Sequence, residues 1–171
     1  MDAIKAMVER RSVRGFKDEQ ITDEQLNQIL KAGMYAPTGR GRQSPIMIAV
    51  QDKETIELLS KMNRKIMGAE YDPFYNAQTI IIVLADKTIP TYLYDGSLVM
   101  GNLMNGAYAV GVDSCWIHRA REEFESEEGK ALLKKWGIEG EYEGIGHVAL
   151  GYRADALPAP KERKSNYVYK I

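Results

Sequence analysis

The chain has 171 residues, 44% of them hydrophobic and 27% charged, as expected for one globular domain with its own core. Its net charge of −1 excludes a global field that would recruit nucleic acid or an anionic membrane, and its single cysteine, Cys115, excludes an internal disulfide and a zinc cluster. One cysteine favours a reducing compartment, and no apolar leader or spanning run is evident. We therefore expect a single cytoplasmic domain over residues 1–171, without nucleic-acid or membrane partners.

The first predicted element is a helix over residues 2–10, with Asp2 as its N-cap. The segment 10–16 follows, and Phe16 is expected to anchor it in the core. Within five residues this segment has three guanidinium groups and one hydroxyl, from Arg10, Arg11, Ser12 and Arg14. Such donors match phosphate oxygens and are costly to bury without an anion. They predict a phosphate clamp; the alternative is a solvated basic turn.

A second helix begins at Thr22, because Gln25 stands in the capping-box position, and it should extend to about residue 35. Pro37 ends this helix and opens a Gly-rich loop over residues 36–45. The loop contains Arg40, Arg42 and Gln43, which suit a phosphate or a planar polar ring. A flexible surface loop is the alternative. It is not a Walker A loop, because the Gly-Lys-Ser/Thr ending is missing.

The rest of the chain alternates between apolar runs and amphipathic segments. Strands are predicted at 46–50, 79–85, 112–117 and 146–152, and helices at 53–66, 92–110 and 122–136. The continuous apolar run at 79–85 indicates a central strand covered on both faces. The helix at 92–110 is apolar on more than one side, which favours either the middle of the domain or a subunit interface.

Residues 153–171 form a C-terminal extension without a globular pattern until Tyr167-Val168-Tyr169. These three residues resemble a strand that has no local partner, which suggests pairing on another subunit.

Several kinds of chemistry are not favoured by the sequence. Of the two histidines, His147 lies in a predicted buried strand, where a hydrogen-bonded core imidazole is expected. Cys115 and His118 stand three apart on a strand, so their side chains should point to opposite faces, and no thiolate–imidazole pair is expected. The carboxylates are scattered, which gives no support for a metal site or a glycosidase pair.

Four segments, in this order and spacing, resemble the FMN-dependent nitroreductase family. They are Arg10-Arg11-Ser12-Val13-Arg14-Gly15-Phe16, Ala36-Pro37-Thr38 through Gln43, Gly111-Val112-Asp113-Ser114-Cys115-Trp116-Ile117, and Ala149-Leu150-Gly151-Tyr152 followed by Lys161-Glu162-Arg163. Each motif is weak alone, but together they cover essentially the whole chain.

The resemblance implies an α+β fold, with a central, mainly antiparallel sheet flanked by helices, in an intertwined homodimer. It also implies FMN at the dimer interface, with the extension 153–171 reaching the partner subunit. Arg10, Arg11, Ser12 and Arg14 would hold the phosphate and the polar edge of the ring, and Lys161 and Arg163 would close on the phosphate. Pro37, Thr38, Gly39 and Gln43 would come from the other subunit, and Trp116, Ile117, His118 and Arg119 would lie against the isoalloxazine, with a backbone amide directed at flavin N5.

The activity implied is ping-pong transfer from NAD(P)H through FMN to a nitroaromatic, a quinone or a similar small acceptor, with no catalytic side chain and no metal. Alternatives are another reduction on the same scaffold (dehalogenation, enone or flavin reduction) or a flavin-binding protein without turnover. Four residues, at three places in the chain, depart from the family pattern. Many members have Asn where this chain has Gly41, Pro-Trp where it has Ser44-Pro45, and Gly where it has Arg119.

Overall fold

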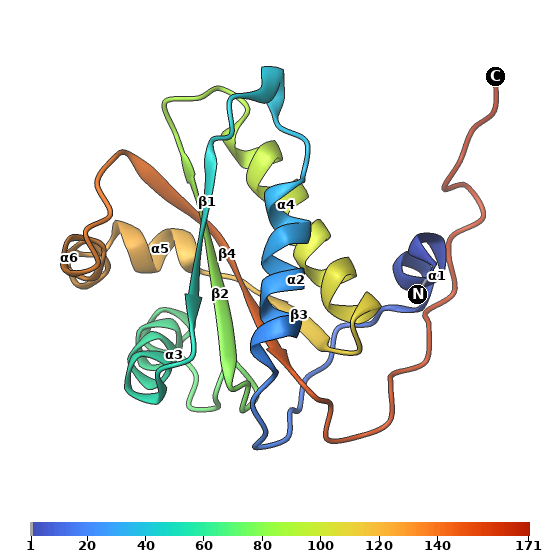
Figure 1. The fold of residues 1–171 in the computed structure, drawn as a ribbon, viewed down its shortest axis with the longest axis horizontal. Helices are drawn as coiled ribbons and strands as arrows, with labels where there is room; N and C mark the ends of the chain where they lie inside the picture. Colours follow the sequence, from blue (N-terminus) through green and yellow to red (C-terminus); the bar gives the residue numbers. More distant parts are fainter. Residues whose placement is uncertain (1) are drawn as a thin grey trace.

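The computed structural model describes residues 2–171, and its centre is a four-stranded sheet with helices on both faces (Figure 1). The strands are β1 (Pro45–Val50), β2 (Thr79–Asp86), β3 (Asp113–Ile117) and β4 (Tyr142–Gly151), in the spatial order β1-β2-β4-β3. All three neighbouring pairs are antiparallel. The predicted α+β architecture with an antiparallel central sheet is confirmed.

Strand β2 is the centre of the core, as its continuous apolar run predicted. Ile80, Ile82 and Leu84 pack into the hydrophobic cluster on one face, and Ile81 and Val83 pack into the cluster on the other. All five side chains are fully buried. The two-residue period of a strand therefore supplies both cores from one segment.

Helices α2 (Asp23–Met34) and α4 (Tyr92–Ala109) cover one face of the sheet, and α3 (Lys53–Met67), α5 (Ala120–Glu125) and α6 (Glu127–Lys135) cover the other (Figure 1). A short 3₁₀ turn, η1 (Gly39–Gly41), precedes β1, and α1 (Ala3–Glu9) packs against α4 at the outside. The predicted caps are present: Asp2 accepts a hydrogen bond from the Lys5 N–H, and Thr22 and Gln25 form a capping box.

Two predicted elements have different boundaries in the structure. The helix expected at 122–136 breaks at Ser126, which ends α5 and caps α6 by accepting a hydrogen bond from the Gly129 N–H at 3.0 Å. Strand β4 begins at Tyr142 rather than at Gly146. Its first part was missed because Glu143 and Gly144 do not resemble a buried strand, yet they pair with β2 beside a bulge between Val83 and Leu84.

Within one chain the segment Tyr167–Tyr169 has no pairing partner, as the sequence predicted, and its pairing as a strand on another subunit stays a prediction. These residues are exposed and form no strand within the described part of the chain, 2–171. A lone segment has no hydrogen-bonding edge beside it, so nothing in one chain stabilises it as a strand. The tail instead runs past α1 and away from the sheet (Figure 1).

Candidate functional site

The arginine segment lies along the free edge of β3. Ser12 forms a parallel bridge with Ser114, and the Val13 N–H donates to the Ser114 carbonyl at 3.0 Å. Val13 and Phe16 are buried, so Phe16 is the core anchor that the sequence predicted. The backbone of this segment is therefore fixed at Ser12 and Val13, and Phe16 anchors its far end.

The guanidinium groups of this segment have donors without acceptors. Arg10 Nη1 and Arg11 Nε are buried and make no hydrogen bond within residues 2–171. Arg11 Nη1 donates to the Val8 carbonyl at 2.7 Å and to the Arg10 carbonyl at 2.8 Å. Burial lowers the pKa of Arg10, and the adjacent Arg11 charge lowers it further. Arg14 is exposed. Half-buried cations with unpaired, buried donors, close in sequence to a hydroxyl, are chemically suited to an anion such as phosphate.

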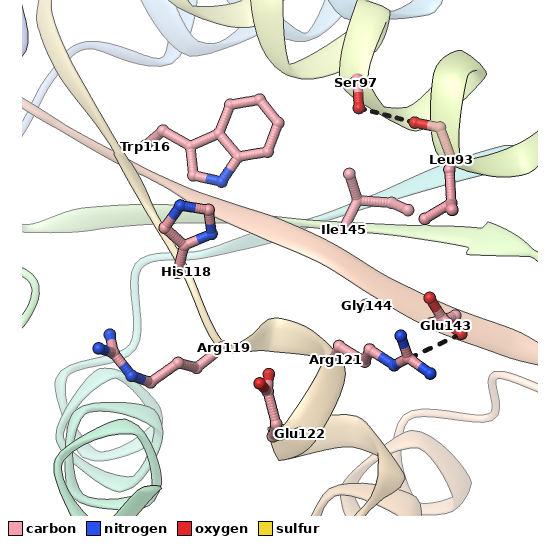
Figure 2. Close-up of a pocket in the computed structure, with 10 residues that line it drawn as sticks. All are labelled: Leu93, Ser97, Trp116, His118, Arg119, Arg121, Glu122, Glu143, Gly144 and Ile145. Carbon is pink, nitrogen blue, oxygen red and sulfur yellow. Dashed lines mark hydrogen bonds and ion pairs between the residues drawn. The ribbon is translucent and has the colours of Figure 1, made fainter. Parts of the chain in front are cut away.

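A pocket of about 470 Å³ opens where β3 ends (Figure 2). Three of its residues belong to the predicted ring-binding segment, and the rings of Trp116 and His118 lie 6.1 Å apart. Trp116 Nε1 is buried without a partner among the described residues. It lies close above the backbone of β4, where a Cβ added to Gly146 would come within 2.6 Å of it. The pocket is lined by Leu93, Ser97, Trp116, His118, Arg119, Arg121, Glu122, Glu143, Gly144 and Ile145.

Opposite charges meet on one wall of this pocket, and the sequence did not reveal them. Arg121 Nε lies 3.8 Å from the buried Glu143 (Figure 2). It also lies 3.1 Å from Glu125. Burial raises the pKa of the Tyr92 phenol, and the Glu143 carboxylate raises it further. Glu143 reaches the wall through the early start of β4, a long-range pairing that leaves no local signal in the sequence.

Arg119 joins β3 to α5 in a left-handed conformation, with φ 79° and ψ 7°. An L-residue with a Cβ costs about 1–2 kcal/mol in this region, whereas glycine adopts it freely. The departure from glycine at this position therefore places backbone strain in the wall of the pocket.

The Gly-rich loop lies elsewhere in the chain. The Gly39 N–H and the Ser44 hydroxyl donate to Asp95 at 2.9 and 2.8 Å, and the Thr91 hydroxyl donates to the same carboxylate at 2.9 Å. Burial alone raises the pKa of Asp95, but these three hydrogen bonds outweigh it and hold the pKa below its usual value. Asp95 is thus the anchor of this loop, which the sequence did not indicate.

The same loop lines a separate cavity of about 280 Å³ together with Pro90 and Thr91. Pro37 and Gln43 are exposed, and Thr38 accepts a hydrogen bond from the Gln43 N–H at 3.1 Å. The turn η1 lies at one end of the molecule, while α1 and the segment after it lie at the other side (Figure 1). One chain therefore brings the arginine segment and β3 together, but not the loop at 37–43.

Of the remaining predicted residues, one lies close to the pocket and two lie on the exposed tail. Ile117 is buried in the core beneath the pocket, and Lys161 and Arg163 are exposed on the tail. Cys115 is buried, and burial raises the pKa of its thiol. No group of three or more His, Cys, Asp or Glu side chains placed to hold a metal occurs in residues 2–171. Within the same residues, no helix has the length and apolar character needed to span a membrane.

These features define an α+β protein in which unpaired guanidinium donors lie along the sheet edge that leads to an aromatic pocket. The sequence pattern of the Nitroreductase family matches residues 7–152, and the chain belongs to this family. A relative from Archaeoglobus fulgidus with the provisional name NADH dehydrogenase/NAD(P)H nitroreductase is 33% identical over 97% of this chain and 90% of its own length.

Two further relatives carry a flavin in their names. A crystal structure described as a nitroreductase with bound FMN, from Bacteroides fragilis, superimposes with a TM-score of 0.89 at 28% identity, over 100% of this chain and 99% of that one. A Bacillus subtilis protein named FMN reductase [NAD(P)H] is 38% identical over 61 residues, which are 36% of this chain and 24% of that protein.

Proposed function

We propose that this protein is an FMN-dependent oxidoreductase that takes electrons from NAD(P)H and passes them to a small acceptor such as a nitroaromatic or a quinone. The observation that carries the proposal is the pair of buried, unpartnered donors Arg10 Nη1 and Arg11 Nε, on the segment that runs along the strand leading to the aromatic pocket of a nitroreductase-family chain. The FMN named in the Bacteroides fragilis structure supports the choice of anion.

The hydrogen-bond donors of the site are of the charged and neutral types that FMN requires. A phosphate would satisfy the arginine segment, and the unpartnered Trp116 Nε1 and Ser114 hydroxyl offer further neutral donors along the same strand. Trp116 and His118 provide aromatic surface for a planar ring. The phosphate and the polar edge of the ring would be held by Arg10, Arg11, Ser12 and Arg14. The face of the ring would lie against Trp116, Ile117, His118 and Arg119. The phosphate would be closed off by Lys161 and Arg163.

The rest of the site would come from a second copy of the chain, through Pro37, Thr38, Gly39 and Gln43. Exposed apolar side chains on α1, on α4 and in the tail support a homodimer, because a monomer would leave them in water. They are Ile4, Met7, Val8, Leu93, Leu98, Tyr167, Val168 and Tyr169. The extension 153–171 would then pack on the partner subunit.

When bound, FMN supplies the hydride chemistry at N5 for both half-reactions. The chain's own residues bind and orient: the guanidinium groups neutralise the phosphate, and the pocket walls limit water around the ring. No side-chain acid or base is needed, since the cofactor carries the electrons.

The experiment is an anaerobic titration of the purified, FMN-loaded protein. The expected result is loss of the visible flavin band with NADH or NADPH, its return when a nitroaromatic or a quinone is added, and a dimer by sedimentation. A protein that binds FMN but is reduced by neither nucleotide would instead be a flavin-binding protein without this activity. A protein that binds no FMN would contradict the proposal.

A further inference from the structure

A network of buried polar side chains lies on the face of the sheet away from α4. It joins Asn63 of α3, Glu123 of α5 and His147 of β4, and each is completely buried. Asn63 Nδ2 donates to the Glu123 carboxylate, and the other Glu123 oxygen lies 3.1 Å from His147 Nε2. The rings of Phe74 and Phe124 lie 5.4 and 6.3 Å from the imidazole.

This network departs from the sequence prediction and from what stability alone would favour. His147 is buried as predicted, but neither ring nitrogen makes an in-line hydrogen bond within residues 2–171. Buried polar and ionisable groups are costly in an apolar core, and apolar side chains of similar volume join helices to a sheet at lower cost. The cost of burying this network therefore points to a role other than packing.

The network ends on the backbone of the pocket. The same Asn63 Nδ2 donates to the His118 carbonyl at 2.8 Å, which turns that carbonyl into the core. All peptide bonds of the described residues are trans, so the N–H of the same peptide, that of Arg119, points to the opposite side. Within residues 2–171 the Arg119 N–H has no acceptor, and both His118 and Arg119 line the pocket.

We propose that Asn63, held in place by Glu123 and His147, is a positioning residue that fixes the His118–Arg119 peptide and so presents the Arg119 N–H to the pocket as a rigid donor for the bound flavin. The inference rests on the proposed function for the identity of the acceptor. The left-handed backbone of Arg119 fits this role, because it lets the chain enter α5 while the carbonyl stays turned inward. The α5 end is also fixed by close packing of the Ala120 backbone on Gly144.

The main test compares Asn63→Leu with Ser60→Ala. Ser60 is a matched control, because it is buried on the same helix and donates to Asp72 at 2.8 Å, away from the pocket. In the flavin-free protein, Asn63→Leu is expected to change the amide chemical shift of Arg119, whereas Ser60→Ala leaves it unchanged. This readout needs neither flavin nor activity.

The second readout uses the FMN-loaded protein. Loss of one well-placed donor is expected to weaken binding of oxidised FMN about tenfold. If reduced FMN binds as before, the two-electron midpoint potential rises by about 30 mV, while Ser60→Ala leaves it unchanged. Should Asn63→Leu fail to fold, Glu123→Gln keeps the side-chain volume but loosens the hold on Asn63, and the same shifts are expected at smaller size.

An Arg119 amide signal and a midpoint potential that match those of Ser60→Ala, in whichever network variant folds, would overturn the inference. Failure of the proposed function is recognised separately, because the unsubstituted protein would then bind no FMN while the amide measurements still report on the peptide.

Discussion

Replacing Arg10 by Met separates two effects of its guanidinium group: the cost of its unpaired donor to stability, and its contribution to the binding of FMN. Methionine keeps an unbranched apolar stem but removes the charge and the buried Nη1 donor that has no acceptor in residues 2–171. An unsatisfied buried donor costs about 1–3 kcal/mol, and because Arg10 is only half-buried the lower end applies. We therefore expect the flavin-free variant to gain about 1 kcal/mol in free energy of unfolding.

The same substitution should weaken the binding of FMN. A hydrogen bond to a charged group contributes about 1.5–3 kcal/mol, which corresponds to about a 10- to 100-fold rise in Kd. Urea unfolding of the flavin-free protein and quenching of FMN fluorescence measure the two quantities. The control is Arg64→Met, because Arg64 lies on α3 and pairs with the exposed Glu57 at 2.6 Å. A variant of Arg10 that is less stable than the parent and binds FMN equally well would refute the reasoning.

Three further predictions concern the walls of the site and its loop. Arg119→Gly should raise the free energy of unfolding by about 0.5–1 kcal/mol, since relief of the left-handed strain exceeds the added chain entropy of glycine; urea titration measures it. Asp95→Asn should lower stability by about 2 kcal/mol at neutral pH, because the three hydrogen bonds lose their charged acceptor. The pKa of Asp95 is depressed in the folded state, so its stabilisation is present above about pH 4 and is lost as the pH falls through the folded pKa. Urea unfolding of the parent and of Asp95→Asn, at neutral and at acid pH, should show the difference in their free energies of unfolding becoming smaller in acid. Gly146→Ala should cost about 2 kcal/mol and shift tryptophan fluorescence, because the new Cβ would crowd Trp116 Nε1 at 2.6 Å and Met100 at 2.9 Å.

Each of these has a contrary result. A glycine at position 119 that destabilises the fold would mean that the Arg119 side chain contributes more than its backbone strain costs. A stability difference at Asp95 that stays constant into acid would show that its charge is not the stabilising feature. An alanine at 146 with unchanged fluorescence would show that Trp116 does not lie close above this glycine.

The fold could be predicted where local patterns decide structure. The apolar run of β2, the caps at Asp2 and Thr22 and the long apolar helix α4 each depend on neighbours within one element. The break at Ser126 was missed because both halves of the predicted helix keep helical spacing, so only the cap chemistry distinguishes them. The early start of β4 depends on pairing with β2, which no local pattern records.

The residues of the candidate site that could be predicted are likewise those with a local signal in the sequence. The arginine segment and the residues after β3 were found from their composition, and one chain places them along the same strand. Glu143, Asn63 and Asp95 were missed, because each acts through contacts with residues far away in the sequence. The assignment of Pro37, Thr38, Gly39 and Gln43 to the site depends on a second copy of the chain and stays a prediction.

In the proposed function, the segment from Arg10 to Arg14 binds the phosphate of FMN along the strand that leads to the pocket at the end of β3. A crystal structure of the FMN-loaded protein tests it most directly. A phosphate oxygen is expected within hydrogen-bonding distance of Arg10 Nη1, with the flavin ring against Trp116 and His118. A flavin bound elsewhere, with Arg10 Nη1 still unpaired, would contradict it.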